Sequence, residues 1–141
     1  MKILVINGPN INLLGKREPE LYGHETYNDL LGYIKGNAII EHVDVECYQS
    51  NHEGDIIDKI QDAYGKFQGI IINAGGYTHT SVAILDALRA VGIPTIEVHL
   101  TDINNREPYR RKSLISEYAI KSYTGQGFEG YKNALCYLKN M

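Results

Sequence analysis

Glu97 and His99 are the residues of this sequence whose types and spacing most directly suggest chemistry. They lie two positions apart in Thr95–Leu100 (TIEVHL), an apolar run that predicts a strand. Residues two apart on a strand point to the same face, so the carboxylate can accept a hydrogen bond from one imidazole nitrogen. Such a bond orients the ring and favours its protonated form, which suits a general acid. A buried structural pair on a central strand is the alternative.

Polar side chains also follow two other predicted strands. Asn7 ends the strand Lys2–Asn7, with Asn10 shortly after it, and Asn73 ends the strand Gly69–Asn73. Ligands of open parallel sheets bind beyond the carboxyl ends of the strands, where the strand order reverses. A single Asn after a strand is usually a turn residue. Because these three amides should converge with the Glu–His pair on one crevice, we favour a functional site.

The loop after the first strand carries Arg17 and Tyr22, which could act together. Leu13–Gly23 (LLGKREPELYG) has charges, two Gly and a Pro but no periodicity, and it leaves the first strand at its carboxyl end. A free phenol loses its proton near pH ~10, so Tyr22 needs help to act as a base at neutral pH. One guanidinium at about 4 Å, with an effective dielectric near 20, supplies on the order of 4 kcal/mol, or roughly three pKa units. Arg17 could supply it, although composition alone fits a surface tyrosine equally well.

Three arginines follow His99 in a polar loop at the same end of the predicted sheet: Arg106, Arg110 and Arg111. A guanidinium binds carboxylates or vicinal hydroxyls with fixed geometry, so the cluster suits an anionic, hydroxylated ligand. A solvated basic face is the alternative.

Other motifs of known chemistry are poorly supported. Gly125–Gly130 (GQGFEG) has the GxGxxG spacing of a dinucleotide site, but the strand and acidic residue that should follow it are missing. The five His residues show no HExxH or HxH spacing and no Cys joins them, so we predict no metal and no cofactor. Ser81 beside His79 could be a nucleophile, but a helix N-cap is the better interpretation for Thr80 or Ser81.

The composition fits one ordinary globular domain. A chain of 141 residues suits a single catalytic domain, residues 1–141. The formal net charge of −3 offers no basic field for nucleic acid or an anionic membrane, and no stretch approaches membrane-spanning length. Cys47 and Cys136 belong to no CxxC pair, so we expect reduced, half-buried thiols and a cytoplasmic protein.

Strands and helices alternate on short connections, which predicts right-handed βαβ crossovers and a parallel sheet with helices on both faces. Five strands suit the flavodoxin-like α/β fold with strand order 2-1-3-4-5. The remaining expected strands are Val43–Gln49, near the sheet edge, and Tyr118–Tyr123. The expected helices run from the N-cap Thr26 to roughly Lys35, over Glu53–Tyr64, over Thr80–Val91, and finally to a point near Lys139. On the third of these, the side chains expected to point inward are Val82, Leu85 and Leu88.

These residues lie in strings that resemble those of the type II 3-dehydroquinate dehydratases, in the same order and with the same spacing. The strings are NGPN at Asn7–Asn10, LGKREPELYG at Leu14–Gly23, QSNHEG at Gln49–Gly54, NAGGYTHTS at Asn73–Ser81 and EVHLTDINNREPYRR at Glu97–Arg111. The resemblance implies a cytoplasmic lyase of the shikimate pathway of aromatic amino acid biosynthesis, which dehydrates 3-dehydroquinate to 3-dehydroshikimate without metal or cofactor. The sequence does not distinguish this role from quinate breakdown.

The resemblance also implies a catalytic role for each matching residue. Tyr22 matches the base that removes the proton next to the substrate ketone, and Arg17 matches the residue that keeps this tyrosine ionised. Asn10 matches the side chain that helps to hold a water against the enolate oxygen. His99 matches the general acid that protonates the departing hydroxyl, with Glu97 behind it.

Further positions match substrate contacts of the family. Asn73, His79 and Arg110 match residues that contact substrate hydroxyls. The backbone at Leu100 and Thr101 matches the part that grips the substrate carboxylate.

Asp86 matches a residue that reaches the site of a neighbouring subunit, and the family forms trimers packed into dodecamers. The sequence departs from the family at Thr101, where Ser is usual, and at Asp102, where Asn is usual. The hydroxyl survives in Thr101, whereas the charge of Asp102 would raise the KM for an anion unless an arginine of the loop neutralises it. Gly36–His42 follows the family only loosely, which leaves the end of the first helix open.

Two other functions remain open on sequence alone. A non-catalytic flavodoxin-like binding or regulatory domain would share the fold, but it would give the Glu97–His99 pair no role. A domain of this kind that accepted phosphate would have an acidic cluster after the first strand, which this sequence lacks. Another cofactor-free lyase or isomerase of polyhydroxylated carboxylates would differ only in the shape of its pocket.

Overall fold

Five parallel strands form one sheet in the order β2-β1-β3-β4-β5, which confirms the predicted flavodoxin-like fold. The computed structural model describes residues 1–16 and 24–141. Within it the strands are β1 (Lys2–Asn7), β2 (Asp44–Gln49), β3 (Gly69–Asn73), β4 (Thr95–His99) and β5 (Lys121–Thr124). Every residue of β3 and β4 is buried, whereas β2 is a half-buried edge strand, as its alternating sequence predicted.

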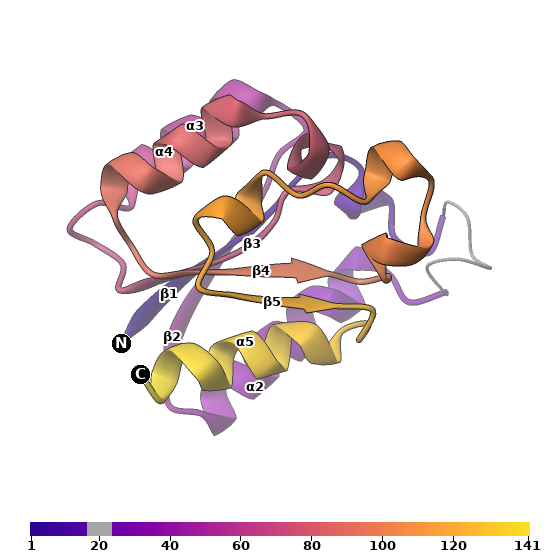
Figure 1. The fold of residues 1–141 in the computed structure, drawn as a ribbon. Coiled ribbons are helices and arrows are strands. Elements are labelled where there is room, and N and C mark those ends of the chain that lie inside the picture. The colour runs from indigo at the N-terminus through magenta and orange to yellow at the C-terminus, as the bar shows by residue number, and fades with distance from the viewer. Residues whose placement is uncertain (17–23) are drawn as a thin grey trace.

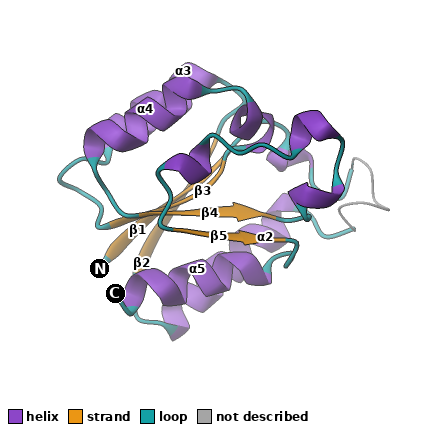
Figure 2. Cartoon of the chain, viewed as in Figure 1, coloured by secondary structure: helices purple, strands orange, loops and turns teal. Residues whose placement is uncertain are grey.

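Helices cover both faces of the sheet (Figures 1 and 2). One layer consists of α2 (Tyr27–Ile40) and α5 (Glu129–Lys139), the other of α3 (Glu53–Asp62) and α4 (Val82–Val91). Alternate side chains of each central strand serve the two layers: Ile3 and Val5 of β1 pack with the first, Leu4 and Ile6 with the second. A strand covered on both faces must be apolar throughout, which explains the unbroken apolar runs of the sequence.

The connections at the carboxyl ends of the strands contain short 3₁₀ turns: η1 (Ile11–Leu13), η2 (Gly75–His79), η3 (Ile103–Asn105) and η4 (Pro108–Arg110). Before β5 lies a fifth turn, η5 (Ile115–Glu117).

Helix α2 is longer than predicted. Thr26 caps it as expected, because its hydroxyl accepts from the Asp29 N–H at 3.1 Å and the Asp29 carboxylate accepts from the Thr26 N–H at 2.9 Å. The helix continues past the predicted end at Lys35 to Ile40. The reason is Ala38, which is buried in the core and makes the last turn part of the packed layer.

Helix α4 begins at Val82, and Ser81 is its N-cap, since the Ser81 hydroxyl accepts from the Ile84 N–H at 2.9 Å. The prediction that Val82 points inward was wrong, because its side chain is 54% exposed. The buried face of α4 is centred on Ile84 and Leu88, which lie one turn apart, and Val82 lies on the other side of the helix.

Strand β5 begins at Lys121 rather than at Tyr118, because η5 precedes it and the Tyr118 N–H closes that turn on the Ile115 carbonyl at 3.0 Å. Strand β4 and helix α3 each end slightly earlier than predicted. Cys47 and Cys136 are free and half-buried, as expected. Among the described residues, no helix is long and apolar enough to span a bilayer.

Candidate active site

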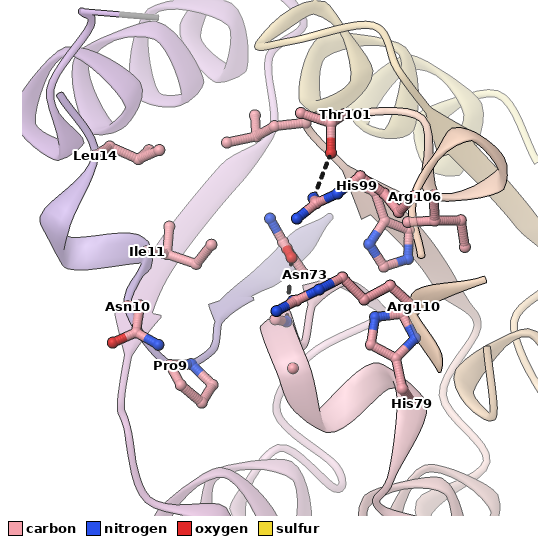
Figure 3. Close-up of a pocket in the computed structure, with 14 residues that line it drawn as sticks. Pro9, Asn10, Ile11, Leu14, Asn73, His79, His99, Thr101, Arg106 and Arg110 are labelled. Carbon is pink, nitrogen blue, oxygen red and sulfur yellow. Dashed lines mark hydrogen bonds between the residues drawn. The ribbon is translucent and has the colours of Figure 1, made fainter. Parts of the chain in front are cut away.

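A cleft of about 310 Å³ opens at the carboxyl ends of β1, β3 and β4 (Figure 3). Its lining residues are Pro9, Asn10, Ile11, Leu14, Asn73, Gly75, Gly76, His79, His99, Leu100, Thr101, Ile103, Arg106 and Arg110. Ile11 and Leu14 form an apolar side, and the imidazoles and guanidinium groups face them across the cleft. Eight of the residues selected from sequence are thus brought together: Asn10, Asn73, His79, His99, Leu100, Thr101, Arg106 and Arg110.

The turn that follows β1 is seated directly on β3. Asn7 and Asn73 are paired in the sheet, and the Gly8 N–H donates to the Asn73 carbonyl at 2.7 Å. A Cβ on Gly8 would lie 2.4 Å from the carbonyl oxygen of Ala74, so only glycine fits between the two chain segments. This close approach fixes where Asn10 enters the cleft.

Asn10 has a left-handed backbone (φ 69°) and is held by a polar clamp from the end of β2. The Asn10 N–H donates to Asn51 Oδ1 at 3.0 Å, and Gln49 Nε2 donates both to the Gly8 carbonyl and to Asn51 Oδ1 at 3.1 Å. Sequence reasoning missed this clamp. The available signal was the position of Gln49 and Asn51 after β2, the strand expected next to β1.

Asn73 lies at the end of β3 with only 4% of its surface exposed. Its Oδ1 accepts from the Gly75 N–H at 3.2 Å, and its Nδ2 donates to the hydroxyl of Tyr131 in α5 at 3.1 Å. The orientation of the amide is therefore fixed at both ends. Tyr131 had not been singled out, because one of eleven tyrosines carries no signal of its own.

Glu97 and His99 form the hydrogen-bonded pair expected from their spacing, with Glu97 Oε2 2.5 Å from His99 Nε2. Glu97 is 1% exposed and His99 is 6% exposed. Two serines that were not predicted also donate to the carboxylate: Ser113 to Oε2 at 2.5 Å and Ser122 to Oε1 at 3.0 Å. A buried carboxylate needs such donors to remain charged.

Burial by itself raises the pKa of Glu97, but the hydrogen bond and positive charge of His99 and the two serine hydroxyls outweigh it. The pKa of Glu97 lies below its ordinary value as a result, so the pair holds a carboxylate against the imidazole. Because Nε2 of His99 is engaged with Glu97, Nδ1 is the nitrogen with which His99 can reach a ligand in the cleft.

His79, at the end of η2, is oriented by a backbone carbonyl. Its Nδ1 lies 2.6 Å from the carbonyl oxygen of Lys112. A carbonyl can only accept, so Nδ1 carries the proton and Nε2 remains for a ligand.

The arginines of the loop after β4 differ in their contacts. Arg106 Nη1 lies 3.4 Å from the Thr101 hydroxyl, and Arg110 Nε lies 2.8 Å from a carboxylate oxygen of Glu107. Both guanidinium groups line the cleft. Arg111 does not, and its Nε donates to the Arg106 carbonyl at 2.6 Å.

Other selected residues lie elsewhere. Asp86 is exposed on α4 and does not line the cleft. Arg17 and Tyr22 lie outside the described residues. Asp102, whose charge we expected to disturb an anionic substrate, accepts from the Asn104 N–H at 3.0 Å and so caps its own turn rather than lining the cleft.

The cleft is rich in hydrogen-bond donors. Amides, imidazoles and guanidinium groups surround it, which suits an anionic ligand with several hydroxyl groups. In residues 1–16 and 24–141, no cluster of three or more His, Cys, Asp or Glu is arranged to hold a metal ion.

Comparison with known proteins shows the family of the chain. The family model described as "Dehydroquinase class II" matches residues 1–139. The chain belongs to this family. The resemblance seen in the five sequence strings is thereby confirmed.

Individual relatives cover nearly the whole chain. A 3-dehydroquinate dehydratase of Clostridium acetobutylicum is 53% identical over 141 residues, which cover 100% of this chain and 98% of the relative. The type II dehydroquinase of Butyrivibrio crossotus has a TM-score of 0.96 at 51% identity, covering 98% of this chain and 97% of that one. The type II dehydroquinase of Propionibacterium acnes gives 0.95 at 36% identity, with coverages of 99% and 97%.

Proposed function

We propose that this protein removes water from 3-dehydroquinate to give 3-dehydroshikimate. The observation that carries the proposal is the position of His99, which lines the cleft and is backed by the buried, ionised Glu97. The choice of substrate is supported by membership of the class II dehydroquinases over residues 1–139.

Elimination of water from a β-hydroxy ketone requires a base for the α-proton, a donor at the developing enolate and an acid for the leaving hydroxyl. His99 is the acid: Glu97 holds its ring through Nε2, and Nδ1 passes a proton to the departing oxygen. Asn10 helps to hold a water against the enolate oxygen. No step changes an oxidation state, so the chemistry calls for no redox cofactor.

Tyr22 is the proposed base, and Arg17 keeps its phenol ionised. The support among the described residues is Leu14, which lines the cleft only a few positions before Arg17. Leu14 lies on the apolar side of the cleft, opposite His99, so the segment that leads to Arg17 starts from that side.

The remaining lining residues bind the substrate. Asn73, His79 and Arg110 contact its hydroxyl groups, and the backbone at Leu100 and Thr101 grips its carboxylate. These roles fit the oriented amide of Asn73 and the oriented imidazole of His79.

A direct assay tests the reaction. The protein is mixed with 3-dehydroquinate in the presence of a chelator, and the ultraviolet absorbance of the conjugated enone is followed. We expect the absorbance to rise as fast with the chelator as without it. Absorbance that stays constant would refute the proposal. His99→Asn should lower the rate by about 10²–10⁴-fold. His42→Asn is the matched control, because His42 has a left-handed backbone that Asn tolerates and does not line the cleft.

Two variants test the base. Tyr22→Phe should lose turnover while it still binds substrate, whereas Tyr64→Phe, at a side chain 70% exposed, should behave as wild type. Arg17→Ala should move the pH optimum upward, because without the guanidinium the phenolate forms only at higher pH. A normal kcat for Tyr22→Phe, or an unmoved profile for Arg17→Ala, would contradict the assignment.

We further propose that the protein is a homododecamer of trimers in which Asp86 serves a neighbouring subunit. The support is that Asp86 is exposed and does not line the cleft of its own chain. Light scattering would give the mass. Each site would take His99 from its own chain and Asp86 from a neighbouring chain. When Asp86→Ala and His99→Asn chains are co-expressed, about one site in four of a random mixture has both residues intact, so activity should be regained. No recovery in mixed oligomers would exclude a role between subunits.

A further inference from the structure

Tyr131 reaches from α5 to the ends of two strands that border the cleft. Its side chain is fully buried, and its hydroxyl donates to Asn7 Oδ1 at 2.6 Å and accepts from Asn73 Nδ2 at 3.1 Å. Asn7 and Asn73 are partners in the β1–β3 register. A phenylalanine would fill the same apolar space without burying a hydroxyl, so packing alone does not account for a tyrosine here.

The direction of these hydrogen bonds is fixed by chemistry. The Gly75 N–H can only donate, so Asn73 turns Oδ1 toward it and Nδ2 toward Tyr131. Burial raises the pKa of the Tyr131 phenol, which therefore stays neutral and keeps its proton for Asn7. Tyr131 can then only accept from Asn73. One N–H of Asn73 is held by Tyr131, and the second is left for the cleft that Asn73 lines.

The sequence before Tyr131 allows this approach. A Cβ on Gly130 would lie 3.2 Å from Val98 Cγ1, so glycine lets α5 pack closely against β4. The GxGxxG spacing of Gly125–Gly130, which resembles a nucleotide motif, thus ends in a residue that brings Tyr131 toward the ends of the strands.

We propose that Tyr131 is a positioning residue that holds the amide of Asn73 with one N–H directed into the cleft, where it donates to a hydroxyl oxygen of the substrate. Asn7 sets the direction of the tyrosine hydroxyl. Tyr131 does not line the cleft and acts only through Asn73. The inference rests on the proposed function, in which Asn73 contacts a substrate hydroxyl.

Tyr131→Phe removes the hydroxyl and keeps the ring. We expect KM for 3-dehydroquinate to rise about 2- to 13-fold, the equivalent of one hydrogen bond to the substrate. The value of kcat should change much less, because a contact to a non-reacting hydroxyl is made equally in the ground state and the transition state. Tyr118→Phe is the matched control: that hydroxyl donates to the Ile93 carbonyl at 2.9 Å, away from the cleft, and KM should stay unchanged.

A double-mutant cycle separates positioning from a general loss of structure. In an Asn73→Ala background, Tyr131→Phe should have no further effect on KM. A second rise of the same size would overturn the inference. Asn7→Ala removes the acceptor that orients the Tyr131 hydroxyl, so it should also raise KM. This variant provides the test if Tyr131→Phe does not fold. An unchanged KM in a folded Asn7→Ala protein would equally overturn it.

Inhibition by quinate and by its analogues that each lack one ring hydroxyl gives an independent readout. Tyr131→Phe should weaken inhibition by every analogue except the one that lacks the hydroxyl bound by Asn73. Equal weakening of all analogues would contradict the proposal. An inactive wild type would refute the proposed function, whereas an active wild type with an unaffected Tyr131→Phe variant would refute only the role of Tyr131.

Discussion

Replacing Gly8 with alanine should damage both the fold and the cleft. The new Cβ would lie 2.4 Å from the carbonyl oxygen and 2.6 Å from the carbonyl carbon of Ala74. Both are backbone atoms, so no side-chain rotation can relieve the overlap. The β1 turn must move away from β3, and the 2.7 Å hydrogen bond from the Gly8 N–H to the Asn73 carbonyl must lengthen or break.

The expected magnitude follows from these two effects. Overpacking a close contact costs about 1–3 kcal/mol, and the lost hydrogen bond adds about 1 kcal/mol. We therefore expect the free energy of unfolding to fall by about 2–4 kcal/mol, a large part of a typical total of about 5–15 kcal/mol. The shift also displaces Asn10 and Asn73, which both line the cleft, and a misplacement of about 1 Å can cost about 10²-fold in kcat/KM.

Urea denaturation at one protein concentration and the enone assay would measure the two effects. The matched control is Gly36→Ala on the exposed side of α2, where a Cβ would meet nothing within 4 Å. There alanine should stabilise by about 0.5–1 kcal/mol, because glycine is a poor helix former. A Gly8→Ala protein within about 0.5 kcal/mol of wild type, with normal kcat/KM, would refute the close approach of the two segments.

The other predictions concern Asn10, Glu97 and the faces of α4. Asn10→Gly and Asn10→Ala should both lower kcat. Only Asn10→Ala should also lower the free energy of unfolding in urea, by ~1 kcal/mol, because the backbone at this position has φ 69°, which glycine adopts without strain. Equal stabilities of the two variants would contradict this backbone strain. The folded pKa of Glu97 is lowered, so its contribution to stability is present above its ordinary pKa and is lost as the pH falls through the lower folded value. Glu97→Gln should therefore flatten the loss of stability in acid, measured by denaturation at several acidic pH values, and an unchanged slope would count against the lowered pKa. Leu88→Ala should cost about 2–5 kcal/mol and Val82→Ala under about 0.5 kcal/mol, and comparable losses on thermal denaturation would reverse the assigned faces of α4.

The strands and the place of the candidate site were predictable from sequence because their signals are local. The unbroken apolar runs Lys2–Asn7 and Gly69–Asn73 coincide with β1 and β3. In parallel order, the residues after such strands must lie at one edge of the sheet. The pairing of Glu97 with His99 follows from their spacing on one strand.

The side chains that support the cleft were not predictable in this way, because their contacts join distant parts of the chain. Ser122 donates to Glu97 across 25 positions, and Tyr131 donates to Asn7 across 124. A serine or tyrosine in an ordinary strand or helix gives no local sign of such a partner. The inward prediction for Val82 failed for a related reason: spacing indicates which residues share a face, but tertiary packing decides which face is buried.

The distribution of buried polar groups separates function from stability in this fold. Thr95, at the start of β4, is also buried, but its hydroxyl bonds to the nearby Ile93 carbonyl at 2.9 Å and needs nothing from distant elements. Glu97, further along the same strand, requires donors from His99, Ser113 and β5 to remain charged. A well-packed apolar residue at that position would often be equally or more stabilising than a buried ion pair. We therefore propose that the Glu97–His99 pair serves the chemistry of the cleft that His99 lines rather than the stability of the sheet.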